Sequence, residues 1–122
     1  MLSECIYTSG GGGNAEIKII DFSDNVTART FNNLTVGKAY RVLAETAWVS
    51  GSVTFTLSSY TGCTQSVITS FTRVKNSGYN SWLGYIEYEI TPSATSITLT
   101  FDRGDVQHFT FYGENASQIT KS

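Results

Sequence analysis

The sequence predicts an all-β fold, an antiparallel β-sandwich of eight or nine short strands. Stretches in which apolar and polar residues alternate recur along the chain, and clusters of Gly, Ser, Asn and Asp separate them. No stretch shows the apolar periodicity of an amphipathic helix. Short strands at such regular spacing are typical of antiparallel sandwiches and barrels.

The clearest corner between two strands lies at residues 34–40. Leu34 ends one apolar run, and Gly37 suits a turn position of positive φ because it has no Cβ. Tyr40 opens the next strand, so we expect its ring to be buried and its hydroxyl to bond the backbone near the turn. Alternation from that point places one set of residues on a single strand face, namely Tyr40, Val42, Ala44, Thr46 and Trp48.

Composition indicates one domain with a sizeable core. The chain has 122 residues, of which 40% are hydrophobic and 15% charged, below the roughly 25% charged residues of an average globular chain. The net charge of −2 and the lack of a basic cluster argue against nucleic acid as a partner. No apolar run is long enough for a membrane span, and we expect no signal peptide because the N-terminus lacks its basic and apolar regions.

We expect no cofactor and no metal. Cys5 and Cys63 are far apart in the chain and His108 is the only histidine, which does not make a zinc site. Both cysteines are expected to be free, buried thiols, with a disulfide between them as the alternative. Asp21 and Asp24 could hold calcium through their side-chain oxygens, but an Asx-type turn is favoured.

The chain divides into an N-terminal arm (1–13), a sandwich domain (14–113) and a C-terminal tail (114–122) that we expect to be frayed. Four glycines, residues 10–13, end the arm and are followed by strand signals, not by a phosphate-binding helix. With this tether the arm could add to the sheet edge of a neighbouring subunit; the alternative is a local first strand.

Strands are expected at residues 16–22, 26–34, 39–49, 53–58, 67–74, 82–91, 97–101 and 106–112. Residues 60–65 and 76–80 are expected to be polar loops. The run Asp-Arg-Gly-Asp at residues 102–105 predicts a hairpin turn between the last two strands.

The order of these signals resembles a known family. The Leu34, Gly37 and Tyr40 corner also occurs in fibronectin type III domains, but there it lies late in the chain and here most strands follow it. The order is more similar to jelly-roll sandwiches of the carbohydrate-binding-module type, with an early corner, a Trp-led strand (81–85) and an Ile-Thr-Leu-x-Phe strand (97–101). The resemblance covers roughly residues 26–112 and implies a jelly-roll-like sandwich.

Small Thr-, Ser- and Gly-rich sandwiches with an N-terminal arm also resemble bacteriophage virion proteins: capsid decoration proteins, head fibres and tail accessory domains. That resemblance implies a non-enzymatic structural protein of the virion, made in the host cytoplasm. It would act by protein–protein binding to capsid or tail proteins and to itself as a homo-oligomer. The alternative function is a carbohydrate-binding module that recognises surface glycans.

Six aromatic residues are candidates for contact with a glycan or a protein partner: Trp48, Tyr60, Tyr79, Trp82, Tyr85 and Tyr112. A flat ring can stack on the apolar face of a sugar while nearby polar side chains bind the hydroxyls. For the two tryptophans the alternative is a place in the core or in an interface.

The densest polar cluster is Asp102, Arg103, Asp105 and His108. Catalysis would need a nucleophile–base pair or two carboxylates across a ligand, and carboxylates that flank a turn are ordinary, so we expect no enzyme. Arg103, Gly104 and Asp105 also spell the integrin-binding tripeptide, a match frequent by chance. The three charged residues of this turn are kept as possible partner contacts.

Glu87 and Glu89 alternate with Ile86, Tyr88 and Ile90. The two glutamates therefore share one strand face, which we expect to be wet, with glycan or partner contact as the alternative.

Overall fold

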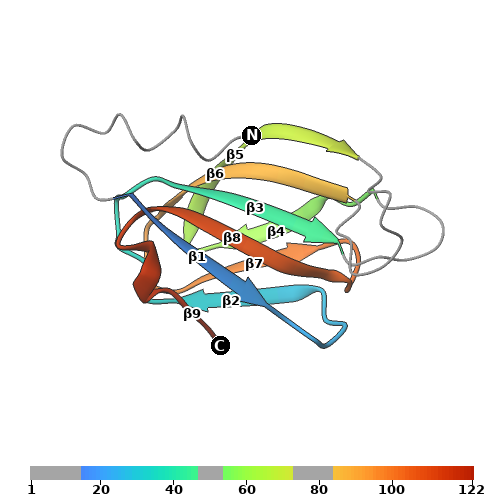
Figure 1. Cartoon of the computed structure of the whole chain (residues 1–122), viewed down its shortest axis with the longest axis horizontal. Coiled ribbons are helices and arrows are strands. Elements are labelled where there is room, and N and C mark those ends of the chain that lie inside the picture. The colour runs from blue at the N-terminus through green and yellow to red at the C-terminus, as the bar shows by residue number, and fades with distance from the viewer. Residues whose placement is uncertain (1–14, 47–53, 73–83) are drawn as a thin grey trace.

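The chain forms an antiparallel β-sandwich of two sheets in this computed structural model, which describes residues 15–46, 54–72 and 84–122 (Figure 1). The predicted all-β sandwich is confirmed. The elements are β1 (Ala15–Asp21), β2 (Ala28–Asn32), β3 (Tyr40–Thr46), β4 (Leu57–Thr61), β5 (Cys63–Thr72), β6 (Gly84–Pro92), β7 (Ile97–Phe101), β8 (Val106–Glu114), the short 3-10 helix η1 (Ala116–Gln118) and β9 (Thr120–Lys121).

One sheet has five strands in the order β1-β8-β3-β6-β5, and the other has four in the order β4-β7-β2-β9. The pairs β1–β8, β2–β7 and β3–β6 are nested, as in a jelly roll, where the two ends of the chain wind together around the sandwich. Strand β5 departs from that order because it pairs with β6 in the five-stranded sheet.

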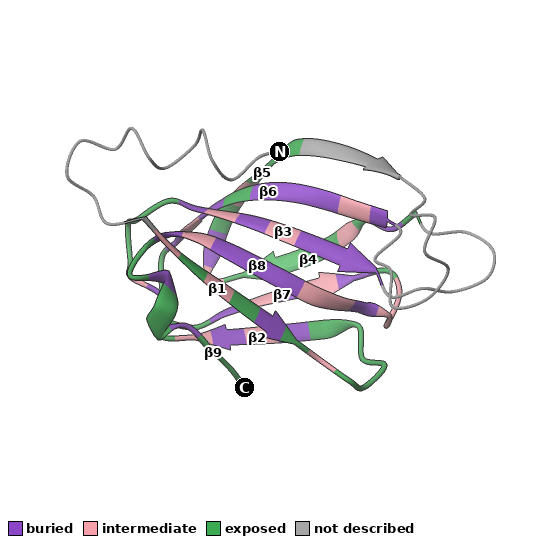
Figure 2. Ribbon diagram, viewed as in Figure 1, coloured by how far each residue is buried: buried purple, intermediate pink, exposed green. Residues whose placement is uncertain are grey.

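Buried residues lie along the strands of both sheets (Figure 2). Their side chains fill the space between the two sheets. At the centre, Phe31 of β2 meets Phe109 and Phe111 of β8, with ring centroids 5.1 and 4.9 Å apart in edge-on geometry. All three rings are fully buried. This aromatic contact joins the two sheets and removes three large apolar side chains from water.

The tyrosine corner forms as predicted. The Thr35 N–H donates a 2.9 Å hydrogen bond to the Tyr40 hydroxyl, and the Tyr40 ring is fully buried. Gly37 has φ +83°, the left-handed conformation that favours glycine. The ring packs so closely on Gly113 of β8 that a Cβ there would lie 3.0 Å from Tyr40 Cδ2.

The expected loop at residues 60–65 is wrong. Strand β4 continues to Thr61 and β5 begins at Cys63, so a single turn residue, Gly62 with φ +81°, separates them. A Cβ on Gly62 would lie 2.5 Å from the Ser96 carbonyl oxygen. Both strands lie at the edge of a sheet and are therefore more exposed to water than central strands. For this reason they carry many polar side chains, which suggested a loop in the sequence.

Two further expectations are corrected. Residues 102–105 are not a hairpin, because β7 belongs to the four-stranded sheet and β8 to the five-stranded one, so this turn crosses between sheets. Residues 114–122 are not a frayed tail, because β9 pairs with β2 and both Ala116 and Ile119 are fully buried. Burial of these two side chains and the pairing with β2 hold this segment on the sandwich.

Several expectations fall outside the described residues: the N-terminal arm with its glycine tether, Cys5, the loop at 76–80, and the ends of the strands expected at 39–49, 67–74 and 82–91. Cys63 is free and buried, as predicted, and burial raises the pKa of its thiol. Within the described ranges, no helix has both the length and the apolar character needed to cross a membrane.

Candidate functional site

The candidate site is the outer face of the five-stranded sheet together with the edge strand β1. We define the outer face as the side chains of β1, β8, β3 and β6 that point away from the core. Register places them in three cross-strand rows: Ile17, Tyr112, Arg41 and Glu89; Ile19, Thr110, Leu43 and Glu87; Asp21, His108, Glu45 and Tyr85.

Charges in the middle of this face are compensated by neighbours. Arg41 Nη1 donates to Glu87 Oε2 at 2.7 Å, and the Glu87 residue is only 3% exposed. The wet face expected for Glu87 and Glu89 is therefore wrong for Glu87, while Glu89 is exposed. Glu87 is buried because β6 is a central strand of the sheet and Arg41, on the adjacent strand β3, covers its carboxylate.

A second polar row crosses the other end of the outer face. His108 Nδ1 contacts Asp21 Oδ1, and His108 Nε2 lies 3.9 Å from Glu45 Oε1. Glu45 is 5% exposed although its side chain is on the outer face. The cross-strand register, which sets Asp21 beside His108 and His108 beside Glu45, brings these three residues of distant sequence together.

The two aspartates considered for calcium have different partners. Asp21 contacts His108, whereas Asp24 Oδ1 accepts a 2.5 Å bond from Arg29 Nη1. The Arg29 hydrogen bond holds the pKa of Asp24 below its ordinary value of 3.8. Among the described residues, no group of three or more His, Cys, Asp or Glu side chains is arranged to hold a metal ion.

Strand β1 presents a backbone edge with which no other described strand pairs, and we call it the open edge. The Phe22 N–H donates to the Gln107 carbonyl at 2.9 Å, just beyond the paired residues of β1 and β8. Because antiparallel ladders alternate, the even-numbered residues of β1 bond to β8, and the N–H and C=O groups of Ile17 and Ile19 point to the open edge. The side chains of these two isoleucines are on the outer face and are 57% and 56% exposed.

The inward side chains of β1 are anchored by η1. Glu16 Oε1 accepts bonds from the Ser117 N–H at 3.0 Å and from the Ser117 hydroxyl at 2.5 Å, which lowers the pKa of Glu16 from its ordinary value of 4.5. Lys18 Nζ donates to the Ser117 carbonyl at 3.2 Å. These contacts fix β1 on the sandwich while its outer side chains stay in water.

The other three edge strands in the described part of the chain carry features that discourage pairing. The register of β5 shifts between Val67 and Thr69, that of β4 shifts between Leu57 and Ser59, and β9 has only two residues. Bulges and short edge strands are common protection against edge-to-edge association. By contrast, β1 runs in unbroken register over all seven of its residues.

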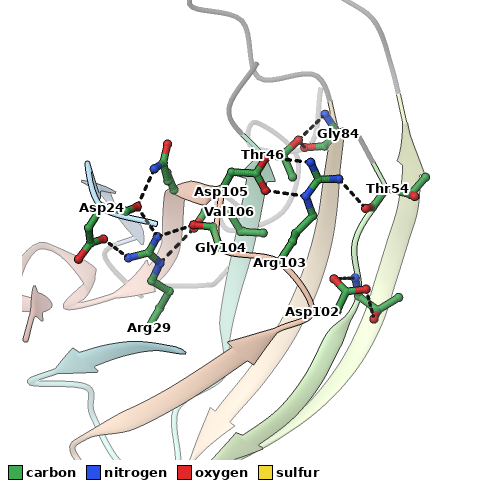
Figure 3. Close-up of polar contacts among 12 residues, drawn as sticks. Asp24, Arg29, Thr46, Thr54, Gly84, Asp102, Arg103, Gly104, Asp105 and Val106 are labelled. Atoms are coloured by element: carbon green, nitrogen blue, oxygen red, sulfur yellow. Dashed lines mark hydrogen bonds and ion pairs between the residues drawn. The ribbon is translucent and has the colours of Figure 1, made fainter. Parts of the chain in front are cut away.

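A buried arginine joins the two turns at one end of the sandwich (Figure 3). Arg29 is 1% exposed, and besides Asp24 Oδ1 it donates to three carbonyl oxygens, those of Asp24 (3.0 Å), Gly104 (3.0 Å) and Val106 (3.2 Å). Its guanidinium carbon lies 4.3 Å from the centre of the Phe22 ring. Arg29 therefore ties the β1–β2 connection to the β7–β8 connection.

The charged residues of the 102–105 turn are used within the fold. Arg103 donates to both carboxylate oxygens of Asp105, at 2.6 and 2.8 Å, and to the Thr54 carbonyl at 3.0 Å (Figure 3). Asp102 accepts bonds from the Thr56 N–H at 3.0 Å and from its hydroxyl at 3.1 Å. The integrin-type tripeptide thus has its arginine and aspartate paired with each other instead of pointing apart.

The candidate aromatics that the structure describes do not form one platform. Tyr60 lies on β4 of the four-stranded sheet and is 41% exposed. Tyr85 and Tyr112 are half-buried on the outer face, in different rows and on strands separated by β3. The remaining three, Trp48, Tyr79 and Trp82, lie outside the described residues.

Sequence reasoning did not single out Ile17, Ile19 or Arg29, nor Arg41 and Glu45 on the outer face. The run Ile-Lys-Ile-Ile at residues 17–20 carried a signal, because alternation must put isoleucines on both faces of such a strand. Nothing local marks Arg29, since its acceptors at Gly104 and Val106 are distant in the chain. Comparisons with protein-family models, with curated proteins and with solved structures found no match to this chain.

Proposed function

We propose that the chain is a non-enzymatic structural protein of a bacteriophage virion, a capsid decoration, head fibre or tail accessory protein, that acts by protein–protein binding. The observation that carries the proposal is the open edge of β1 with Ile17 and Ile19 more than half exposed. A sheet edge of this kind binds an extended segment of a partner through main-chain hydrogen bonds, and the flanking apolar side chains add contact area.

The electrostatics of the outer face support binding to a protein surface. Arg41 and Glu87 neutralise each other, and the His108 ring lies between the carboxylates of Asp21 and Glu45. A partner that covered the Arg41–Glu87 pair would not have to bury an uncompensated charge there, which is a large cost of such an interface.

Particle binding is the direct test. The purified chain should co-sediment with particles of the phage whose genome encodes it, and mass spectrometry of gradient-purified particles should detect the chain. Ile17→Lys should abolish co-sedimentation. Val67→Lys is the matched control, because Val67 is 53% exposed on the opposite edge of the same sheet, where the strand is bulged. Purified particles without the chain that also fail to bind it would contradict the proposal.

A carbohydrate-binding module is the second candidate, favoured by Tyr85 and Tyr112 on one sheet face with Arg41 on the strand between theirs. A glycan array tests it, with Tyr85→Ala and Tyr112→Ala as variants for the outer face. Variants at Trp48, Tyr79 and Trp82 test the other predicted aromatics. Retention of a glycan that one of these variants removes would favour this function over the first.

A further inference from the structure

We propose that two copies of the chain form a symmetric dimer by antiparallel pairing of their β1 strands, which joins two five-stranded sheets into one. The inference deepens the proposed protein-binding function, on which it rests, by naming a second copy as the partner of the β1 edge. A two-fold axis uses the same surface on both subunits, so the edge has to be complementary to itself.

Backbone geometry limits the possible registers. The N–H and C=O groups of Ile17 and Ile19 face the open edge, so in a new antiparallel ladder these odd-numbered residues must form the hydrogen-bonded pairs. Of the registers that meet this condition, those that pair an exposed isoleucine with an isoleucine of the partner have the two-fold axis at Ile17, Lys18 or Ile19. Each choice sets a different residue opposite the inward-facing charges of Glu16 and Lys18.

Charge selects the register centred on Ile17. There, Glu16 faces the partner's Lys18 and Lys18 faces the partner's Glu16, which gives two complementary cross-strand pairs. The register centred on Lys18 sets that residue against its own copy, a like-charge pair. The register centred on Ile19 sets Lys18 opposite the partner's Ile20, an apolar residue that is 5% exposed in each subunit.

The apolar side chains agree with this choice. In the selected register Ile17 lies beside the partner's Ile17 on the outer face, at the two-fold axis. Ile19 lies one step further along the same face on each side. The dimer would therefore cover the isoleucines that are most exposed in the monomer and would satisfy the open backbone edge of β1.

Cross-linking distinguishes the registers. In a Cys5→Ser background, which leaves Cys63 buried, Ile17→Cys should form an intersubunit disulfide under mild oxidation, because directly paired Cα atoms lie within disulfide range. Ile19→Cys is the matched control and should not cross-link, since the two Ile19 positions are four residues apart along the ladder. Cross-linking of Ile19→Cys without Ile17→Cys would overturn the register.

Association in solution tests the dimer itself. Analytical ultracentrifugation over a concentration series should show a monomer–dimer equilibrium, and Ile17→Lys should raise the dissociation constant by at least about tenfold. Glu16→Lys and Lys18→Glu should each weaken the dimer, and the double variant Glu16→Lys with Lys18→Glu should restore it. Circular dichroism melts confirm that each variant is folded.

The outcomes separate the two proposals. A wild-type chain that stays monomeric at millimolar concentration overturns the dimer, yet it can still bind particles and leave the proposed function standing. If the double variant Glu16→Lys with Lys18→Glu dimerises no more tightly than either single variant, the Ile17-centred register is overturned. A dimer that binds no particle would count against the virion function alone.

Discussion

Replacing Arg29 with methionine should destabilise the fold more than removing any exposed charge. Methionine keeps much of the apolar stem but loses every donor of the guanidinium. Arg29 is 1% exposed and donates to Asp24 Oδ1 and to the carbonyls of Asp24, Gly104 and Val106. The change therefore acts on the junction between the β1–β2 and β7–β8 connections.

The size of the effect follows from which acceptors lose their partner. The Asp24 side chain is 62% exposed, so water can replace the guanidinium there, and the Asp24 carbonyl keeps a 2.7 Å bond from Gln107 Nε2. The Val106 carbonyl sits in a buried contact and the Gly104 carbonyl in a partly buried one. Removing the donor from a buried acceptor lowers the free energy of unfolding by about 1–3 kcal/mol for each acceptor. Loss of the cation–π contact with Phe22 lowers it by about 0.5–2 kcal/mol more.

Part of that loss is offset because a guanidinium no longer has to be desolvated. We therefore expect Arg29→Met to lower the free energy of unfolding by about 2–4 kcal/mol, and the melting temperature by roughly 10 °C. Urea unfolding followed by circular dichroism measures the change.

Lys38→Met is the matched control, since Lys38 is 54% exposed and its ion pair with Glu114 spans 3.5 Å at the surface. The control should lose no more than about 0.5 kcal/mol. An Arg29 variant as stable as this control would refute the reasoning that the buried guanidinium holds the two connections together.

Three further changes test separate parts of the structure. Tyr40→Phe removes the acceptor of the Thr35 N–H and should cost about 1–2 kcal/mol in urea unfolding with no change in the circular dichroism spectrum. Tyr88→Phe should leave stability equal or raised by up to about 1 kcal/mol, because the buried Tyr88 hydroxyl, whose pKa desolvation raises, has no hydrogen-bond partner among the described residues. Asp24→Asn should destabilise the chain at neutral pH, and the difference from wild type should shrink as the pH falls below 3.8. The sign follows because a carboxyl group whose pKa is lowered in the folded state stabilises the fold at pH values above its ordinary pKa, and this stabilisation is lost as the group is protonated. A difference that does not shrink below pH 3.8 would contradict it.

Local sequence signals were sufficient for the corner and for most strands. The Gly37 turn and the buried Tyr40 ring were predictable because a positive-φ glycine and period-two alternation are properties of neighbouring residues. Residues 97–101 alternate Ile-Thr-Leu-Thr-Phe, and the three apolar residues of β7 are buried as expected. The same local reading failed at residues 60–65 and 102–105, where the answer depends on which sheet each strand joins.

The candidate site was predictable only in part. The sequence alone determined that this chain is all β, that residues 34–40 make a tyrosine corner, and that the Ile-rich residues 16–22 form a strand. Tertiary structure alone decided that β1 is an edge, that Arg29 is buried, and that Glu87 meets Arg41. The physical reason is distance along the chain: alternation is set between neighbours, whereas an open edge or a buried charge is set by pairing between strands that are far apart in sequence.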